Sequence, residues 1–423
     1  MRDGTDARAG GTVRGDAGGG DNGRMASPAS TSVSSPLPPL VEPAADLDRD
    51  EVARYSRHLI IPNVGVTGQK RIKNAKVLVI GAGGLGSPTL LYLAAAGVGT
   101  IGIVEFDEVE ESNLQRQVIH GRSDVGRPKA HSARDSILEI NDRVDVRLHE
   151  FRLDSGNAVA LFSQYDLILD GTDNFATRYL VNDAAILAGK PYVWGSIYRF
   201  EGQVSVFWEA APDDRGLNYR DLYPEAPAPG TVPSCAEGGV LGVLCASIGS
   251  VMATEAIKMI TGIGEPLLGR LMIYDALSMN YRTIRLRRDP GRAPVTELID
   301  YDAFCGVVTD DARDAAADGT VTAPELAALV TAGDVALIDV REPVEWEIVH
   351  IDGATLVPKG RILSGEALAE LPQDRPIVAY CKTGIRSAEV LAALKQAGFS
   401  DARHLQGGIT AWAAQVDPSL PTY

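Results

Sequence analysis

Short apolar runs alternate with turns along residues 47–289. The run at residues 76–80, Lys-Val-Leu-Val-Ile, has the continuous apolar character of a strand that is buried on both faces. A glycine-rich turn follows it, and residues 87–96 then have the spacing of a helix that ends at Gly97. Similar runs predict three more buried strands, at residues 100–105, 166–170 and 191–195. Alternation at residues 202–208 predicts an antiparallel extension. Together these elements predict a doubly wound α/β domain.

A second, smaller α/β unit is predicted after a stretch with little periodicity. Residues 290–319 are charged and contain Pro and Gly, which is typical of a linker. Beyond them, residues 336–340 and 376–380 read as strands, and residues 387–397 as a helix closed by Gly398. The sequence therefore predicts a domain at residues 320–423.

The first 46 residues have a different composition from the rest of the chain. They are rich in Gly, Ser, Pro, Ala and Asp and contain almost no large apolar side chain. Such a segment buries too little surface to offset its ordering entropy, so residues 1–46 are predicted to form a disordered tail. The segment lacks the apolar region of a signal peptide, and we hypothesise that Met25 is the start of the protein.

Composition narrows the class of protein. Hydrophobic residues make up 45% of the 423 residues, and 40 Lys and Arg against 56 Asp and Glu leave a formal charge of −16. That balance argues against non-specific nucleic-acid binding, which depends on clustered cations. No run approaches the roughly 18 apolar residues of a membrane span, and the four cysteines are too scattered for a secreted disulfide framework. We expect a cytoplasmic protein that binds neither nucleic acid nor membrane.

The glycine-rich turn is a candidate phosphate site with a Rossmann-like context. Four glycines, Gly81, Gly83, Gly84 and Gly86, lie between the first strand and the first helix of the pattern. Glycines let phosphate approach the backbone, and a helix N-terminus favours anions. Glu105 ends the next strand and is placed to bind ribose hydroxyls. Taken alone, this motif fits NAD(P) or FAD as well as it fits ATP.

Three charged residues further along favour ATP and adenylation chemistry. Arg116 and Lys129 supply cations for a triphosphate and its transition state. Asp173 follows a buried strand, where a carboxylate can ligate Mg²⁺. Asn113 and Asn174 can bond to adenosine or phosphate oxygens. Each of these residues alone has a plainer explanation, such as a surface lysine or a helix cap, and only the ordered set indicates an adenylating enzyme.

Residues 54–284 resemble the MoeB/ThiF branch of the ubiquitin-activating-enzyme (E1)-like superfamily. The matching segments are residues 54–57 (Arg-Tyr-Ser-Arg), 81–86, 112–117, Lys129 and 172–174. The resemblance implies a nucleotide site that also includes Ser112, Asn113, Leu114 and Gln115, with ATP and Mg²⁺ as ligands. It also implies a homodimer, because Arg57 matches an arginine that reaches the nucleotide of the partner subunit. Glu105 stands where most relatives have Asp.

Many members of that family hold a structural Zn²⁺ with two Cys-x-x-Cys pairs. The resemblance places these pairs at Asn218 and Asp221 and near Asp302 and Cys305, so that only one of the four is a cysteine. One thiolate with an amide and two carboxylates is a poor tetrahedral zinc site. We therefore expect no structural zinc.

Cys235 is a candidate intermediate of the reaction. It lies in a Pro- and Gly-rich stretch just before an apolar helix, and a cysteine near a helix N-terminus gains thiolate character. In the family this position can capture the activated acyl group or form a disulfide. The alternative is a small buried side chain, and core packing is the expected role of Cys245 and Cys305.

Cys381 is the stronger candidate nucleophile. The segment from Cys381 to Arg386, Cys-Lys-Thr-Gly-Ile-Arg, joins a predicted strand to a predicted helix that begins at Ser387. Backbone N–H groups of such a loop, with the helix dipole behind them, stabilise a thiolate or a persulfide anion. Lys382 and Arg386 add positive charge, and Gly384 permits the turn.

Residues 322–412 resemble the rhodanese domain. The loop at Cys381 matches, as do the segments around Asp339 and Arg341, around His350, and at residues 405–412. Asp339 and Arg341 are expected to form an internal ion pair, and His350 to support the scaffold. Cysteine-dependent phosphatases share this fold, but their loop is about one residue longer, so the six residues here favour sulfur.

The two resemblances together imply one reaction sequence. The enzyme would adenylate the C-terminal glycine of a ubiquitin-like sulfur-carrier protein that ends in Gly-Gly. A Cys381 persulfide, charged from thiosulfate or a cysteine desulfurase, would then convert the glycine to a thiocarboxylate. Molybdopterin, thiamin, cysteine or tRNA thiolation would use the sulfur. Three alternatives remain at this level: a Rossmann oxidoreductase, a non-enzymatic scaffold for carriers, and a conjugating E1.

Overall fold

The computed structural model describes residues 37–227, 238–305 and 319–423, which form two α/β domains. Residues 1–36 lie outside the described part, so the predicted tail of residues 1–46 can be compared with the structure only at residues 37–46. There the prediction is wrong, because Leu37 and Val41 are buried in the first core. The backbone N–H of Leu40 donates to the carbonyl of Met259 over 3.1 Å. The folded region therefore begins before residue 46.

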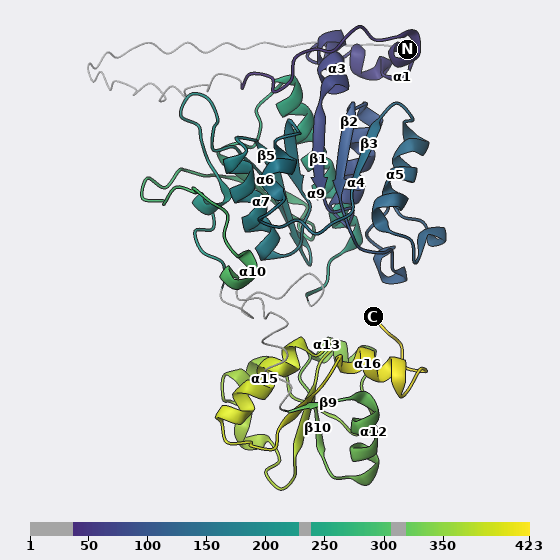
Figure 1. Cartoon of the computed structure of the whole chain (residues 1–423), viewed down its shortest axis with the longest axis vertical. Helices are drawn as coiled ribbons and strands as arrows, with labels where there is room; N and C mark the ends of the chain where they lie inside the picture. The colour runs from purple at the N-terminus through teal and green to yellow at the C-terminus, as the bar shows by residue number, and fades with distance from the viewer. Residues whose placement is uncertain (1–36, 228–237, 306–318) are drawn as a thin grey trace, which may run out of the picture. The chain divides into compact units, whose positions relative to one another are not determined.

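An eight-stranded sheet forms the centre of the first domain (Figure 1). Its order is β3-β2-β1-β4-β5-β6-β7-β8; the first five strands are parallel and the other three antiparallel. The strands are β1 (Lys76–Ile80), β2 (Thr100–Val104), β3 (Asp145–His149), β4 (Leu167–Asp170), β5 (Tyr192–Tyr198), β6 (Glu201–Phe207), β7 (Arg270–Asp275) and β8 (Asn280–Arg285). This confirms the doubly wound domain and its antiparallel extension. Strands β3, β7 and β8 were not anticipated.

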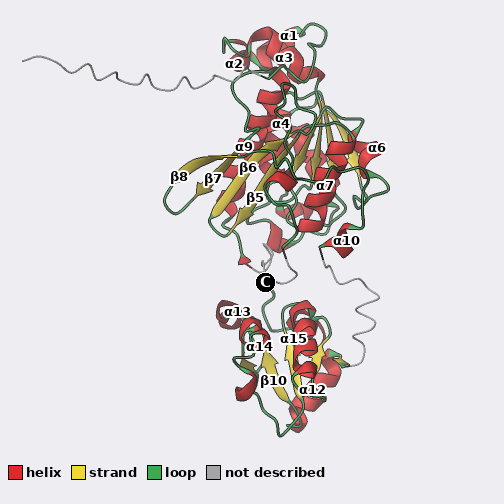
Figure 2. Cartoon of the chain, turned by 90° about the vertical axis from the view of Figure 1, so that its left-hand side faces the viewer, coloured by secondary structure: helices red, strands yellow, loops and turns green. Residues whose placement is uncertain are grey.

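Helices cover both faces of this sheet (Figure 2). Val77 and Val79 of β1 face one core, and Leu78 and Ile80 face the other, as the two-residue period of a strand requires. The first core takes in α3 (Gly65–Asn74), α4 (Gly86–Ala96), α5 (Lys129–Ile140) and α9 (Gly242–Thr261). The second takes in α6 (Ala158–Phe162) and α7 (Phe175–Leu187). Two short helices, α1 (Arg49–Arg54) and α2 (Ser56–Leu59), precede α3.

The expectation that no segment has the length of a membrane span needs correction, because helix α9 meets the length and composition criteria of one. It packs instead against α4, β5 and β6, and Ile248, Met252 and Ala256 are buried there. Its apolar character follows from its position at the centre of the first core.

The predicted linker is shorter than expected, because its first part packs on the first domain. Tyr301 begins α10 (Tyr301–Phe304) and is buried in the second core. Its hydroxyl donates to Asp183 over 2.7 Å. Arg292 donates to Asp221 over 2.9 Å. Residues 290–305 are thus tied to the first domain, whereas residues 306–318 lie outside the described residues.

The second domain contains a five-stranded parallel sheet in the order β11-β10-β12-β13-β9. Its strands are β9 (Thr320–Val321), β10 (Ala336–Asp339), β11 (Thr355–Leu356), β12 (Ile377–Tyr380) and β13 (Arg403–Leu405). Its helices are α12 (Ala323–Ala332), α13 (Pro343–Ile348), α14 (Lys359–Leu363), α15 (Ile385–Gln396) and α16 (Gly408–Gln415). The predicted smaller α/β domain is confirmed, although α15 begins two residues earlier than expected.

Candidate functional site

The glycine turn lies where the strand order of the first sheet reverses, between β1 and β4. Ligands of doubly wound folds bind at this switch point. Gly81 has φ +90°, a conformation that favours glycine. A Cβ on Gly86 would lie 2.0 Å from the carbonyl oxygen of Gly81. Only glycine fits at residue 86, and the turn brings backbone to the N-terminus of α4, as an anion site requires.

Glu105 holds this turn in place. Its Oε2 accepts from the backbone N–H of Ala82 over 2.9 Å. Its Oε1 accepts from the N–H groups of Phe106 and Asp107, over 2.9 and 3.0 Å. The side chain is buried, and its bonds join the end of β2 to the glycine turn. The predicted contact of Glu105 with ribose hydroxyls stays a prediction, and Oε2, which accepts only one of the three bonds, retains acceptor capacity for it.

The segment after β2 brings Arg116 to the glycine turn. A Cβ on Gly84 would lie 3.8 Å from Cγ of Arg116, and a Cβ on Gly83 would lie 3.7 Å from Nε2 of Gln117. Arg116 is partly exposed and donates to the carbonyl of Ser112 over 3.0 Å. This geometry leaves a cation beside the predicted phosphate site.

The 3₁₀ turn η1 (Glu111–Asn113) carries the rest of the predicted nucleotide contacts on this side. Asn113 is buried and its side-chain oxygen accepts from the N–H of Glu110 over 3.3 Å. Ser112 and Gln115 are exposed, and Leu114 is half-buried. Asn113 therefore shapes the turn, and the exposed pair is available to a ligand.

Lys129 is not an ordinary surface lysine. It begins α5 and is buried, and its Nζ lies 3.3 Å from Oδ2 of Asp107. The backbone N–H of Lys129 also donates to the carbonyl of Asp107 over 2.8 Å. The lysine is thereby fixed near the end of β2. The sequence analysis did not consider Asp107, because nothing in its surroundings marks it as the partner of a residue 22 positions away.

The loop after β4 lies against the glycine turn. The N–H of Gly171 donates to the carbonyl of Ile80 over 3.1 Å, and a Cβ on Gly171 would lie 3.3 Å from the nitrogen of Gly86. Asp173 is exposed in this loop. Asn174 caps α7, accepting from the N–H of Thr177 over 2.8 Å. The plainer explanation, a helix cap, therefore applies to Asn174 and not to Asp173.

Asp170, the last residue of β4, is a buried carboxylate that no sequence motif marks. Burial raises its pKa, although hydrogen bonds from Thr172 act in the opposite direction. Its Oδ1 accepts from the backbone N–H and the hydroxyl of Thr172, over 3.0 and 2.6 Å. Its Oδ2 is buried without a hydrogen-bond partner. An unsatisfied buried oxygen is rare in proteins, so this side of the turn has spare capacity for a donor or a cation.

His120 is another residue that the sequence did not reveal. Its Nε2 lies 3.0 Å from the carbonyl oxygen of Ala82, and its Nδ1 lies 2.8 Å from Oγ of Ser132. A carbonyl only accepts, so Nε2 carries the proton and the Ser132 hydroxyl donates to Nδ1. Burial lowers the pKa of His120, which keeps the ring neutral. The histidine thus ties α5 to the glycine turn, a tertiary contact with no sequence motif.

The side chains at the expected zinc positions have other partners. Asn218 donates to Glu209 over 2.9 Å, and Asp302 accepts from Arg152 over 2.9 Å. Cys305 packs beside the second core, where burial raises the pKa of its thiol. In the described ranges, no three His, Cys, Asp or Glu side chains gather as a metal site.

In the second domain, Cys381 lies at the end of β12 under the N-terminus of α15. It is only 1% exposed. Its Sγ accepts from the backbone N–H of Gly384 over 3.1 Å and lies 3.7 Å from Oγ of Ser387. Gly384 has φ +99° and is the N-cap of α15. One backbone N–H is thus aimed at an enclosed sulfur, and the role of Cys381 as the sulfur-bearing nucleophile stays a prediction.

Arg386 belongs to the first turn of α15 and not to the loop. Its Nη1 and Nη2 donate to the two oxygens of Glu345, over 2.7 Å each. Burial alone would raise the pKa of Glu345, but the bonds from Arg386 lower it to about 2. The sequence analysis missed Glu345, which lies on α13, 41 residues away.

The scaffold residues of this domain behave as predicted. Arg341 is fully buried and donates through Nε to Oδ1 of Asp339 over 2.9 Å. His350 stacks on Trp346, and its Nδ1 lies 3.0 Å from the carbonyl of that residue. The internal ion pair and the supporting role of His350 are confirmed.

Three predictions remain, which concern Cys235, Cys245 and the dimer contact of Arg57. Cys235 falls outside the described residues. Cys245 is buried in the first core, as expected. Arg57 lies exposed on α2, and its predicted contact with a partner subunit stays a prediction.

An anion-binding turn on one domain and a sulfur-enclosing loop on the other define a transferase with two activities. Residues 55–294 match the ThiF family, and residues 322–415 match the rhodanese-like domain. The chain belongs to the ThiF family and carries a C-terminal rhodanese-like domain. The predicted combination of domains is confirmed.

Three similar proteins are named for one or both of these activities. The probable adenylyltransferase/sulfurtransferase MoeZ of Mycobacterium tuberculosis is 73% identical over 92% of this chain and 100% of that protein. The adenylyltransferase and sulfurtransferase MOCS3 of Drosophila ananassae is 40% identical over 89% of this chain and 86% of that protein. The sulfur carrier protein adenylyltransferase of Thermus thermophilus is 52% identical over 61% of this chain and 98% of that protein. The prediction of an enzyme with adenylyltransferase and sulfurtransferase activities is confirmed.

A solved structure shares the fold of the first domain. The crystal structure of E. coli MccB with MccA-N7isoASN has a TM-score of 0.51 and 21% identity, over 57% of this chain and 74% of that chain.

Proposed function

We propose that this enzyme uses ATP to adenylate the C-terminal glycine of a ubiquitin-like sulfur-carrier protein and then replaces the activated oxygen with sulfur from Cys381. One observation carries the proposal. The same chain holds a cation beside a glycine turn, at Arg116, a second cation after β2, at Lys129, and an enclosed thiol that accepts a backbone N–H, at Cys381. Adenylation does not require the enclosed thiol, and sulfur transfer to a small acceptor does not require the nucleotide site, whereas thiocarboxylate synthesis requires both.

In the first step, a carboxylate oxygen of the terminal glycine attacks the α-phosphorus of ATP, and pyrophosphate leaves. Arg116 and Lys129 offset the charge that builds up on the phosphates. The N-terminus of α4 and the N–H groups of the glycine turn bind phosphate oxygens. Glu105 binds the ribose while it holds the turn.

Asp173 is the proposed ligand of the Mg²⁺ that accompanies ATP. The donor chemistry fits, because Mg²⁺ prefers oxygen ligands and Asp173 is an exposed carboxylate in the loop that also holds the unpartnered Oδ2 of Asp170. Bound Mg²⁺ would neutralise phosphate charge.

In the second step, the terminal sulfur of a Cys381 persulfide attacks the activated carbonyl, and AMP leaves. A second thiolate, proposed as Cys235, then attacks the Cys381 sulfur. The carrier is released as a thiocarboxylate, and a Cys235–Cys381 disulfide remains. An external dithiol reduces this disulfide, so the electrons balance. Thiosulfate or a cysteine desulfurase supplies the persulfide sulfur.

The proposal extends to assembly and location. A homodimer would bring Arg57 to the nucleotide of the partner subunit, as the family resemblance implies. The enzyme would act in the cytoplasm, where its carriers and a reducing dithiol are found.

Mass spectrometry of candidate carriers tests the proposal. Purified enzyme, ATP and thiosulfate are incubated with a carrier that ends in Gly-Gly, and the expected product shows exchange of one oxygen for sulfur at the C-terminus. A carrier without its last glycine and a reaction without ATP are the controls. Formation of a stable thioester with another protein, with no thiocarboxylate, would overturn the proposal.

A further inference from the structure

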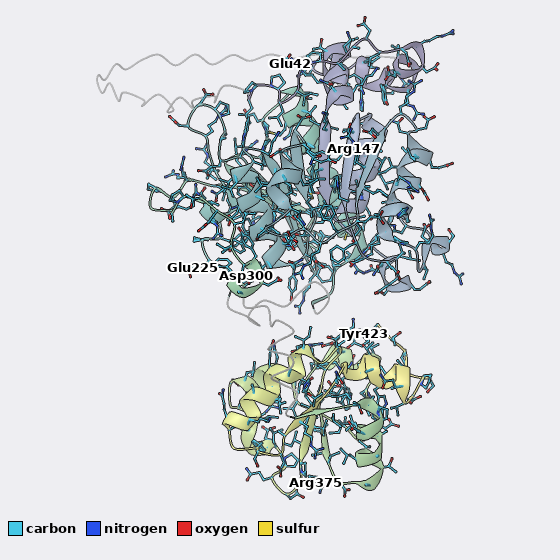
Figure 3. All side chains as sticks on the ribbon, in the orientation of Figure 1. Glu42, Arg147, Glu225, Asp300, Arg375 and Tyr423 are labelled. Carbon is cyan, nitrogen blue, oxygen red and sulfur yellow. The ribbon has the colours of Figure 1, made fainter. Side chains whose placement is uncertain are left out.

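The hydroxyl group of Tyr423 joins Arg341 to Glu345, the residue that holds Arg386, and no motif in the sequence reveals this connection. Its Oη accepts from Nη1 of Arg341 over 2.7 Å and donates to Oε1 of Glu345 over 2.8 Å. The directions are fixed, because a guanidinium only donates and a carboxylate only accepts. Figure 3 labels Tyr423.

The hydroxyl is linked through one residue to Arg386, the cation in the first turn of α15. Glu345, which accepts from Tyr423, also receives both terminal nitrogens of Arg386. Arg341, Glu345 and Arg386 are all buried, so these bonds act in a low dielectric, where charge-assisted bonds are strong and an unpaired donor is costly. Burial raises the pKa of Tyr423, which keeps the hydroxyl protonated and able to donate.

The ring of Tyr423 makes an independent second contact. Nζ of Lys382 lies 4.6 Å from the ring centroid, within the range of a cation–π interaction. Lys382 follows Cys381 directly, and burial lowers the pKa of its ammonium group. The two cations of the Cys381–Arg386 segment therefore meet Tyr423, one through the ring and the other through Glu345.

We propose that Tyr423 is a positioning residue for sulfur transfer, which fixes the positions of Lys382 and Arg386, the two cations of the segment that begins at Cys381. An anionic donor such as thiosulfate, and the persulfide anion that it leaves, both depend on this charge. The ring and the hydroxyl act on different cations, so their contributions can be separated. The inference rests on the assignment of Cys381 as the sulfur-bearing residue.

The test measures sulfur transfer to cyanide in the full-length enzyme with two donors. Thiosulfate is a dianion and leaves as sulfite, whereas dimethyl trisulfide is uncharged, gives its central sulfur to the Cys381 thiolate and leaves as dimethyl disulfide. Tyr423→Phe removes the hydroxyl and keeps the ring, and Tyr423→Leu removes both. We expect kcat/KM for thiosulfate to fall on the order of tenfold in Tyr423→Phe, the size of one hydrogen bond to a charged group, and further in Tyr423→Leu. Most of the fall should be in KM, and dimethyl trisulfide should be affected much less.

Leu420→Ala is the matched control, because Leu420 packs against the same apolar cluster as Tyr423 and brings no polar group. It should lower the unfolding temperature without changing the ratio of kcat/KM for the two donors. If Tyr423 had a purely structural role, both of its variants would keep the wild-type ratio of kcat/KM for the two donors, and all three variants would differ from the wild type only in stability. That result would overturn the inference. Cys381→Ala separates the role of Cys381 from the role of Tyr423. Sulfurtransferase activity that survives in Cys381→Ala refutes the assignment of Cys381. Loss of activity in Cys381→Ala, together with wild-type kcat/KM values in both Tyr423 variants, refutes only the role of Tyr423.

Discussion

The backbone N–H of Gly384 donates to Sγ of Cys381 over 3.1 Å, directly at the N-terminus of α15. A helix N-terminus carries partial positive charge, so it stabilises a sulfur anion at this position more than it stabilises a thiol. Gly384 makes this contact in a conformation with φ +99°, which favours glycine. The chemistry of Cys381 and the conformation of Gly384 are therefore coupled.

Replacement of Cys381 by alanine should separate the two activities. We expect carrier-dependent ATP–pyrophosphate exchange at the wild-type rate, because the glycine turn and its cations lie on the other domain. Thiocarboxylate formation should be lost, which mass spectrometry of the carrier would show. Equal loss of both activities would contradict the division of labour.

Gly384→Ala should impair sulfur transfer more than its effect on stability explains. A Cβ at residue 384 would lie 3.1 Å from the nitrogen of Gly407, and φ is +99°. Gly398, at the other end of α15, also has φ +99° but has nothing within 4 Å of an added Cβ. Gly398→Ala therefore reproduces the backbone strain, about 1 kcal/mol, without disturbing Cys381. Thiosulfate:cyanide sulfurtransferase activity should fall at least tenfold in Gly384→Ala and stay near wild type in Gly398→Ala; equal losses would refute the coupling.

Gly86→Ala and Gly83→Ala should affect the adenylation domain in different ways. A Cβ at residue 86 would clash with the backbone of Gly81, whereas a Cβ at residue 83 has ordinary contact with Gln117 at 3.7 Å. We expect Gly86→Ala to destabilise the domain by several kcal/mol or to prevent folding, because a backbone clash leaves no room to relax. Gly83→Ala should keep the unfolding temperature and raise KM for ATP in the exchange assay. A normal KM in a well-folded Gly83→Ala would remove Gly83 from the nucleotide site.

The buried pair of Glu345 and Arg386 predicts a loss of stability in acid. The pKa of Glu345 is about 2 in the folded protein, against an ordinary value of 4.5. The unfolded chain takes up a proton as the pH falls through 4.5, and the folded chain does so only near 2. The stabilisation is therefore complete above about 4.5 and is lost progressively down to about 2; a shift of this size corresponds to about 3 kcal/mol.

Hydrogen–deuterium exchange of peptides from residues 319–423 would measure this effect. The difference in stability between wild type and Glu345→Gln should be largest at neutral pH and shrink between pH 4.5 and 3. Glu370→Gln is the control, because Glu370 makes only an exposed pair with Arg361. A difference that did not change with pH would show that the charge of Glu345 contributes nothing.

Tyr301→Phe should loosen the segment that follows the first domain. The Tyr301 hydroxyl donates to the buried Asp183, which also accepts from Arg220. Removing one donor from a buried carboxylate should lower the stability of the domain by about 1–2 kcal/mol. Tyr92→Phe, on an exposed side chain of α4, should change it by less than about 0.5 kcal/mol. Urea unfolding of the two variants checks both values.

Sequence patterns predicted the elements that bury continuous apolar runs. Strands β1, β2, β4 and β5 were found for this reason, and glycines marked both candidate sites. Strand β8 was missed because all six of its residues are exposed, so its sequence has no buried face. Residues 290–305 were taken for a linker because polar contacts hold much of this segment in place, such as those of Arg292 with Asp221 and Tyr301 with Asp183. Polar contacts between residues that are distant in sequence produce no periodic pattern of apolar residues.

The same limit applied to the sites. Cys381, Arg116 and Lys129 were identified because their residue types and order match an adenylating and sulfur-transferring chain. His120 and Glu345 act through Ala82 and Arg386, residues that are far from them in sequence. A single sequence without relatives gives no sign of such pairs, and only the folded chain reveals them.

The near-complete enclosure of Cys381 has a consequence for what can react with it. With 1% of the residue exposed, a bulky reagent meets the rim of the loop before it reaches the sulfur. Slender reactants are favoured: a small inorganic anion, or a peptide end whose last two residues lack side chains. The domain is therefore expected to select its reactants by size. Bulky thiols and oxidants would not reach a sulfane sulfur that is bound to Cys381.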